Sequence, residues 1–106
     1  MADDQTFGKL CKKKEQSFNL IGKKWIISII HTLMEKPKRF SEIHAYIPDL
    51  SKKMLNERMK ELEDHGIVER DVISERPLRT EYTLTAKGLG LGQALKSIED
   101  WADEWW

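Results

Sequence analysis

Residues 40–66 read FSEIHAYIPDLSKKMLNERMKELEDHG, and this stretch decides the fold. Ser41 is expected to cap a first short helix, because a serine side chain can accept a hydrogen bond from the free amides of a first turn. Ser51 is expected to cap a second helix over 52–65, and Gly66 follows it at the position where helices favour glycine. Two helices joined by a turn of about four residues predict a helix-turn-helix.

The pattern changes after this pair of helices, from a helical period to alternation. Alternation predicts a strand over 67–73 and a returning strand over 81–84, with a loop over 74–80 between them. A β-hairpin that directly follows a helix-turn-helix is a wing. The expected fold is therefore mainly α with a small β-hairpin, an α+β winged helix-turn-helix.

The flanking segments complete a single domain over residues 1–106, which suits a chain of 106 residues. Helices are expected over 9–21 and over 25–34, and the second of these is expected to be nearly all buried. A last helix is expected over 85–106. Residues 1–8 have no apolar period and are expected to be frayed and flexible.

The composition, 40% hydrophobic and 34% charged, is that of a globular protein. The longest apolar-rich stretch, 25–34, is far shorter than the roughly 20 residues of a membrane span. No signal peptide opens the chain, so we expect a cytoplasmic protein without a membrane partner. The single cysteine, Cys11, excludes an internal disulfide and a thiolate-rich zinc site, while a disulfide between two chains stays open.

No catalytic motif stands out in the sequence. The glycines at 88, 90 and 92 form G-x-G-x-G, which matches neither nucleotide-binding spacing. The three histidines are not spaced as a metal pair, and the carboxylates cluster in solvated-looking runs such as Glu61, Glu63 and Asp64. We therefore expect no enzyme, no cofactor and no metal site.

The net charge of zero hides a division along the chain. Residues 5–60 carry thirteen Lys or Arg against five Asp or Glu, whereas residues 61–106 carry five against eleven. This asymmetry suggests an anionic partner for one face of the protein, and ordinary solvated surface is the alternative.

The helix over 52–65 has two opposite faces when its residues are placed about 100° apart. The apolar face, which is expected to meet the core, holds Leu55, Met59 and Leu62. The opposite face is polar and holds Lys53, Asn56, Glu57 and Lys60. Asparagine can pair with adenine and lysine can donate to guanine, while Lys52 stands in the first turn, where phosphate is favoured. This pattern is typical of a helix that reads DNA, and a solvated amphipathic helix is the alternative.

Basic residues also occupy the segments beside this helix. Arg76 and Arg79 are expected at the tip of the hairpin, where arginine can enter a narrow minor groove or clamp phosphate. Lys36, Lys38 and Arg39 precede the first helix of the pair and could contact backbone phosphate. For the two arginines, the alternative is an exposed loop whose charge is balanced by nearby glutamates. For the three residues before the first helix, the alternative is that their charges only increase solubility.

The last helix begins at the expected cap Thr85 and carries an apolar stripe at intervals of three and four residues. The stripe comprises Leu91, Leu95, Ile98, Trp101 and Trp105. Two such helices would cover each other in a symmetric dimer, and packing on the chain's own domain is the alternative. The three glycines in its first turns predict either an irregular start or the close approach of another backbone.

The chain contains, in order, Cys11, LIGKKW (20–25), KRFSEI (38–43), IPDLSKKML (47–55), LEDHGIVER (62–70), PLRTEYTLTAKG (77–88) and a tryptophan near its end. In this order the segments resemble the HxlR-type winged-helix transcriptional regulators of bacteria and archaea, which are related more distantly to the MarR regulators. The resemblance spans residues 11 to about 101.

The resemblance implies a homodimer joined through the first and last helices, with each recognition helix in a major groove and each wing on flanking DNA. Half-sites would lie about one helical turn apart, roughly 34–36 Å, or a multiple of it. We expect a dimeric repressor that binds double-stranded DNA at a pseudo-palindromic operator. A winged-helix module for protein contact and a nonspecific architectural DNA-binding protein are the alternatives. The resemblance implies DNA contacts at Ser51, Lys52, Lys53, Asn56, Lys60, Arg76 and Arg79.

In one branch of this family, a cysteine at the position of Cys11 senses electrophiles or oxidants through a thiolate that is modified or linked between subunits. Lysines at positions 9, 12, 13 and 14 surround Cys11, and nearby cations favour a reactive thiolate. Lys12 stands where the family pattern often has proline, and inert packing is the alternative role for Cys11.

Overall fold

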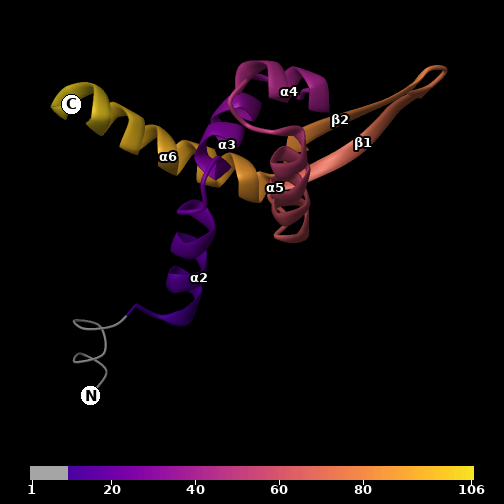
Figure 1. Ribbon diagram of the computed structural model, residues 1–106. Helices are drawn as coiled ribbons and strands as arrows, with labels where there is room; N and C mark the ends of the chain where they lie inside the picture. The colour runs from indigo at the N-terminus through magenta and orange to yellow at the C-terminus, as the bar shows by residue number, and fades with distance from the viewer. Residues whose placement is uncertain (1–9) are drawn as a thin grey trace.

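The computed structural model describes residues 10–106, without the side chains of residues 74 and 75. Within this range the fold is a winged helix-turn-helix, as the sequence predicts (Figure 1). The expectation of frayed residues 1–8 lies outside the described residues. The elements, in chain order, are α2 (Lys12–Ile21), α3 (Ile26–Glu35), α4 (Phe40–Tyr46), α5 (Lys52–Asp64), β1 (Val68–Glu75), β2 (Leu78–Leu84) and α6 (Ala86–Trp105).

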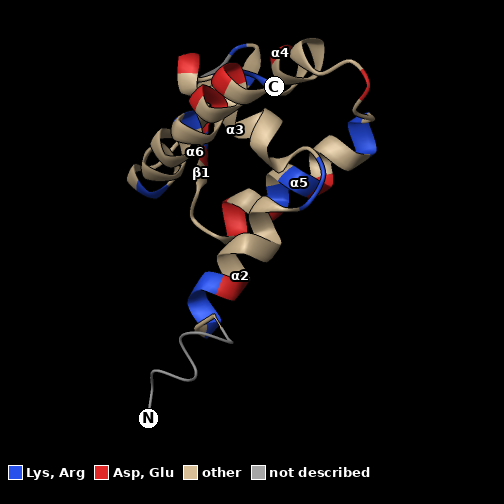
Figure 2. Ribbon diagram, turned by 90° about the vertical axis from the view of Figure 1, so that its left-hand side faces the viewer, with Lys and Arg blue, Asp and Glu red and all other residues tan. Residues whose placement is uncertain are grey.

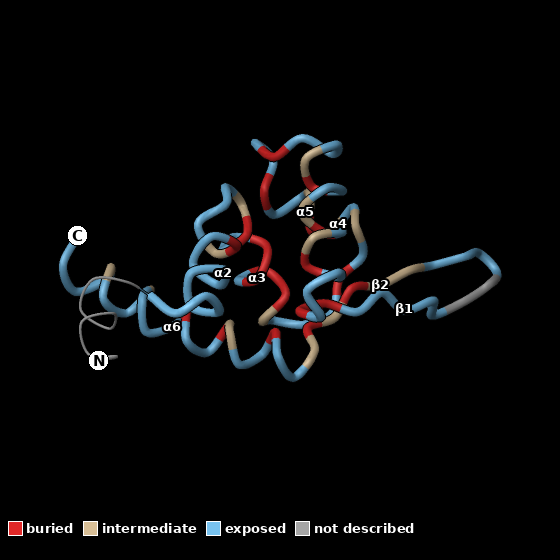
Figure 3. The backbone as a smooth tube through the Cα atoms, turned by 90° about the horizontal axis from the view of Figure 1, so that it is seen from below, coloured by how far each residue is buried: buried red, intermediate tan, exposed pale blue. Residues whose placement is uncertain are grey.

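The core lies where α3, the helix pair α4 and α5, and the base of the hairpin meet (Figure 3). Ile26, Ile29 and Ile30 of α3 are wholly buried, as their spacing predicts, and Leu55 and Leu62 of α5 join them in one cluster. The expectation that this helix is nearly all buried is wrong, because only one side of α3 meets the core and Ile27, Ser28 and His31 are exposed. Complete burial of an aliphatic side chain of this size contributes about 1.5–3 kcal/mol. These contacts fix the apolar back of α5 and leave its other face to solvent.

Two of the three predicted helix caps are confirmed. The Ser51 side chain accepts a hydrogen bond from the Met54 backbone amide at 3.1 Å, and Thr85 does the same for Gly88 at 3.1 Å. The prediction of Ser41 as a cap is wrong, because α4 already begins at Phe40.

The physical reason for the early start of α4 is a backbone bridge to the wing. Lys38 donates its amide to the Tyr82 carbonyl at 3.0 Å, and its own carbonyl accepts from the Tyr82 amide at 2.8 Å. This pairing ends the extended backbone at Arg39, whose amide donates to the Glu42 carboxylate at 2.8 Å. Arg39 therefore stands at the N-cap position.

The hairpin is longer, and its turn shorter, than the predicted loop over 74–80. Antiparallel pairing continues through Ser74 opposite Arg79 and Glu75 opposite Leu78. A ladder is held by backbone groups, so polar residues that break the apolar alternation can still extend it. The outer half of the hairpin projects from the body, and Arg79 lies in β2 rather than in the loop (Figure 1).

Helix α6 is regular through its glycines, and two of them permit close packing. A methyl group at Gly88 would overlap the carbonyl oxygen of Ile67, and one at Gly92 would overlap the side chain of Met34. The predicted close approach of another backbone is therefore confirmed at Gly88, whereas Gly92 meets a flexible side chain. The molecule extends over 60 × 31 × 24 Å, and no helix within residues 10–106 is long and apolar enough to cross a membrane.

Candidate nucleic-acid interface

Helix α5 presents the two faces that its sequence predicts. Leu55, Met59 and Leu62 are at most 1% exposed and face the core. The opposite face is solvent-exposed and consists of Lys53, Asn56, Glu57 and Lys60. Figure 2 shows the basic positions on α5 at the surface of the body. This face carries amine and amide donors together with one carboxylate acceptor, which are the groups that read base edges in a major groove.

The first turn of α5 adds groups that suit phosphate. The Ser51 hydroxyl accepts from the Met54 amide, so its own proton remains available for donation. Lys52 follows it and is exposed. The free amides and the positive end of the helix dipole favour an anion at this point. Within residues 10–106, neither Lys52, Lys53 nor Lys60 forms an ion pair.

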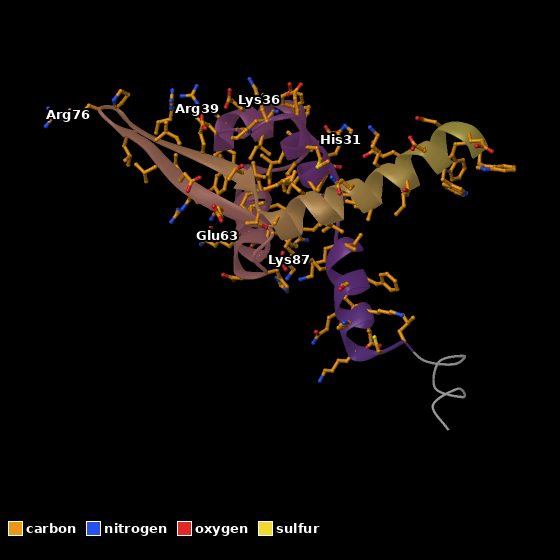
Figure 4. All side chains as sticks on the ribbon, turned by 180° about the vertical axis from the view of Figure 1, so that it is seen from behind. His31, Lys36, Arg39, Glu63, Arg76 and Lys87 are labelled. Atoms are coloured by element: carbon orange, nitrogen blue, oxygen red, sulfur yellow. The ribbon has the colours of Figure 1, made fainter. Side chains whose placement is uncertain are left out.

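The two wing arginines predicted to contact DNA lie at different places on the hairpin. Arg76 is exposed in the turn at the far end of the hairpin, as predicted (Figure 4). Arg79 is exposed on β2, three residues nearer the body. Figure 4 also places Arg39 on the same edge of the molecule as Arg76.

Lys38 cannot contact phosphate as the sequence suggests, because it is only 1% exposed. Its ammonium donates to the Glu35 carboxylate at 2.6 Å and lies 5.0 Å from the centre of the Tyr46 ring. The Tyr46 hydroxyl donates to the same carboxylate oxygen at 3.2 Å. The hydrogen bond from Lys38 holds the pKa of Glu35 below its ordinary value. Lys38 thus ties the end of α3 to α4 and the wing, while Lys36 and Arg39 stay exposed.

A polar cluster on the side of α5 was missed by sequence reasoning, which took Glu61 for a solvated residue. Glu61 accepts from the Lys23 ammonium and, at 2.8 Å, from the Arg58 guanidinium. Arg58 also donates to the Lys24 carbonyl at 2.9 Å. The hydrogen bond from Lys23 is the main cause that lowers the pKa of Glu61. The spacing of Arg58 and Glu61 could have indicated their pairing, whereas Lys23 is 38 residues from Glu61 and carries no such signal.

The apolar stripe of α6 divides between two environments. Leu95 is 4% exposed and Leu91 packs against the core, so this half covers the chain's own domain. Ile98, Trp101 and Trp105 are 56%, 54% and 70% exposed in the half that projects from the body (Figure 3). Of the five stripe residues, the three in the second half of α6 are therefore the exposed ones.

Cys11 is an exposed free thiol at the N-cap position of α2. Exposed lysines follow it at positions 12, 13 and 14, and position 9 lies outside the described residues. Helix α2 begins on the side of the molecule away from the wing (Figure 1).

The HxlR-like helix-turn-helix family model matches residues 20–106, from the end of α2 to the last residue. The chain belongs to the HxlR-like helix-turn-helix family. It is a DNA-binding transcription regulator of the winged helix-turn-helix class, and this family relationship confirms the resemblance seen in the sequence.

Relatives of this HxlR-like protein include transcriptional regulators and redox regulators. The HTH-type transcriptional regulator YodB of Bacillus subtilis is 50% identical over 95 residues, which cover 90% of this chain and 85% of YodB. The structure of reduced YodB covers 91% of this chain and 94% of its own with a TM-score of 0.82. YodB has also been solved after diamide treatment and with bound quinone. The redox regulator HypR in its reduced form is 30% identical, with a TM-score of 0.81 over 88% of this chain and 92% of its own.

Proposed function

We propose that this HxlR-like protein is a homodimeric repressor that covers a promoter by binding a pseudo-palindromic operator. The observation that carries the proposal is the exposed face of α5, whose amine and amide groups lie opposite a wholly buried apolar face. Since chromosomal DNA is the proposed ligand, the proposed location is cytoplasmic.

Each candidate contact has a distinct proposed role. Asn56 pairs with adenine, and Lys53 and Lys60 donate to guanine or to nearby phosphate. Ser51 and Lys52 hold a phosphate at the start of the helix. The wing residues Arg76 and Arg79 reach the flanking minor groove or its phosphates.

The proposed dimer joins α2 and α6 of one subunit to those of its partner. Ile98, Trp101 and Trp105 of α6, together with Phe18 of α2, are all more than half exposed. The radius of gyration is 16.1 Å, against about 13 Å for a compact domain of some 100 residues. A second copy would bury both the projecting half of α6 and the exposed side of α2, and C2 symmetry is the commonest way to do so.

The proposed signal is chemical modification of Cys11, and the described states of YodB and HypR support it. A thiolate can add to a quinone ring carbon, after which the ring takes up a proton and becomes a hydroquinone thioether. Alternatively, a diazene oxidant takes two electrons and two protons from two thiols, and their sulfur atoms join. Because the chain has a single cysteine, that disulfide links two molecules.

The decisive experiment compares the affinity of reduced protein for its own upstream intergenic DNA and for a scrambled duplex, across a salt series. We expect at least about 10³-fold preference for the genomic fragment, as specific regulators show. Equal affinity for both duplexes would instead indicate an architectural protein. Absence of binding at low salt would indicate a module for protein contact.

The response to oxidants is tested with Cys11→Ser. We expect diamide or a quinone to weaken DNA binding by the wild type and to leave the variant unchanged. If both proteins lose affinity equally, Cys11 is not the sensor.

A further inference from the structure

The recognition helix α5 is tied to the N-terminal part of the chain by a set of charged hydrogen bonds that we name the Glu61 clamp. The clamp consists of Glu61 and Arg58 on α5, and of Lys23 and the carbonyl of Lys24 in the turn between α2 and α3. Arg58 is 18% and Glu61 25% exposed at the side chain, so both groups are partly withdrawn from water. Hydrogen bonds between charged groups are shorter and more directional than those between neutral groups.

The turn that receives the clamp has an unusual backbone conformation. Trp25 has a φ of 80°, in the left-handed region that aromatic residues rarely adopt. The Lys24 ammonium lies 4.9 Å from the centre of the Trp25 ring. Together with the hydrogen bond from Arg58 to Lys24, these contacts join the turn to one side of α5.

The position of this support matters because α2 leads directly into it. In the proposed dimer, α2 belongs to the surface that joins the subunits, so the clamp links each recognition helix to the dimer surface. DNA offers its half-sites in steps of one base pair, which shifts them by about 3.4 Å and rotates them by about one-tenth of a turn. Base contacts by hydrogen bonds tolerate far less than one such step.

We propose that Glu61 is a positioning residue that sets which half-site spacing the dimer accepts. By bridging Lys23 and Arg58, it fixes the offset of α5 from the dimer surface and thereby the distance between the two recognition helices. This inference rests on the proposed dimeric function. It assigns no DNA contact to Glu61 itself.

The test measures affinity for a series of operators whose half-sites are one base pair closer, unchanged, or one or two base pairs further apart. We expect the wild type to prefer the best spacing by about tenfold or more over its neighbours, as for a lost base contact. Glu61→Gln should reduce this preference to about threefold or less while affinity for a duplex with one half-site stays unchanged. Lys23→Gln removes the same ion pair between Lys23 and Glu61 from its other end, and it should reduce the spacing preference to the same extent.

Glu63→Gln is the matched control, because it removes the same charge from an exposed residue of the same helix that lies outside the clamp. It should keep the wild-type spacing preference. The double variant Lys23→Gln/Glu61→Gln should be no broader in its preference than either single variant, since both remove one interaction.

The outcomes separate this inference from the function on which it rests. If the wild type prefers one spacing and both Glu61→Gln and Lys23→Gln keep that preference, the clamp does not set the spacing and the proposed dimer stands. If the wild type shows no spacing preference at all, the two-fold operator is wrong and the inference falls with it.

Discussion

Helices α5 and α6 both carry an apolar stripe at helical intervals, yet the two stripes meet different surroundings. The stripe of α5 is buried along its whole length, whereas that of α6 is covered only as far as Leu95. Beyond that point Ile98, Trp101 and Trp105 face solvent. The comparison teaches that an apolar stripe indicates burial but not the partner that provides it. A short helix inside a small domain is covered by its own chain, while the 20-residue α6 extends beyond the part of the domain that covers it.

The buried stripe of α5 is tested most strongly by Leu55→Ala. Leu55 is wholly buried, so the change removes apolar contacts and leaves a cavity. We expect the free energy of unfolding to fall by about 2–5 kcal/mol, measured by urea denaturation. Lys60→Ala on the exposed face of the same helix serves as the control and should change stability by less than about 0.5 kcal/mol. Equal effects of the two changes would contradict the assignment of faces.

The exposed part of the α6 stripe is tested with the double variant Trp101→Ala/Trp105→Ala. If these side chains are buried between subunits, each truncation should cost about 2 kcal/mol or more of association energy, as at interface hot spots. Two truncations together amount to about 4 kcal/mol or more, so the dissociation constant of the dimer, measured by sedimentation, should rise by about 10³-fold or more. Lys96→Ala, also exposed on α6, should leave it unchanged. A wild type that is monomeric throughout would show that a second copy does not cover this stripe.

The polar face of α5 is tested with Asn56→Ala, which changes hydrogen bonding without changing charge. Loss of a bidentate pair with adenine should weaken specific binding by about 1–3 kcal/mol. Nonspecific affinity and the salt dependence of binding should stay as in the wild type, because no phosphate contact is removed. Lys53→Ala should instead lower the affinity for both the operator and the scrambled duplex, and it should reduce the salt slope by about one. Fluorescence anisotropy with an operator and a scrambled duplex measures all of these quantities.

The smallest expected effect concerns the stability that Glu61 contributes at the edge of α5. The hydrogen bond from Lys23 lowers the pKa of Glu61 below its ordinary value of 4.5, so the folded state favours the carboxylate. Its stabilising effect is therefore complete well above pH 4.5 and is lost as the pH falls through the lower pKa of the folded state. Glu61→Gln should cost at most about 1 kcal/mol near neutral pH, since the bridge is partly exposed. The free energies of unfolding of wild type and variant should become equal at low pH. A difference between them that grows as the pH falls would contradict the prediction.

The helix pair and its wing could be predicted because their signals are local. Ser51 and Gly66 mark the two ends of α5 through interactions within a few residues, and both are in their expected positions. The faces of α5 follow from helix geometry alone. Lys53, Asn56 and Lys60 could therefore be placed together on one exposed surface without a structure.

Three residues could not be placed in this way, because distant parts of the chain decide their surroundings. Lys38 is buried by its pairing with the wing strand and by Tyr46, although its sequence neighbours Lys36 and Arg39 are exposed. Arg79 belongs to a strand because the facing backbone at Ser74 pairs with it. Glu61 meets Lys23 across a separation of 38 residues.

The amino-acid sequence by itself determined the order of the helices, the wing, the exposed polar face of α5 and the family. These depend on capping, periodicity and motif order, which act over short distances along the chain. Only the tertiary structure decided which lysine is buried, where the α6 stripe leaves its own core, and how Glu61 ties α5 to the turn after α2. Such contacts join segments far apart in the chain, and no local pattern records them because they form only when the core brings the segments together.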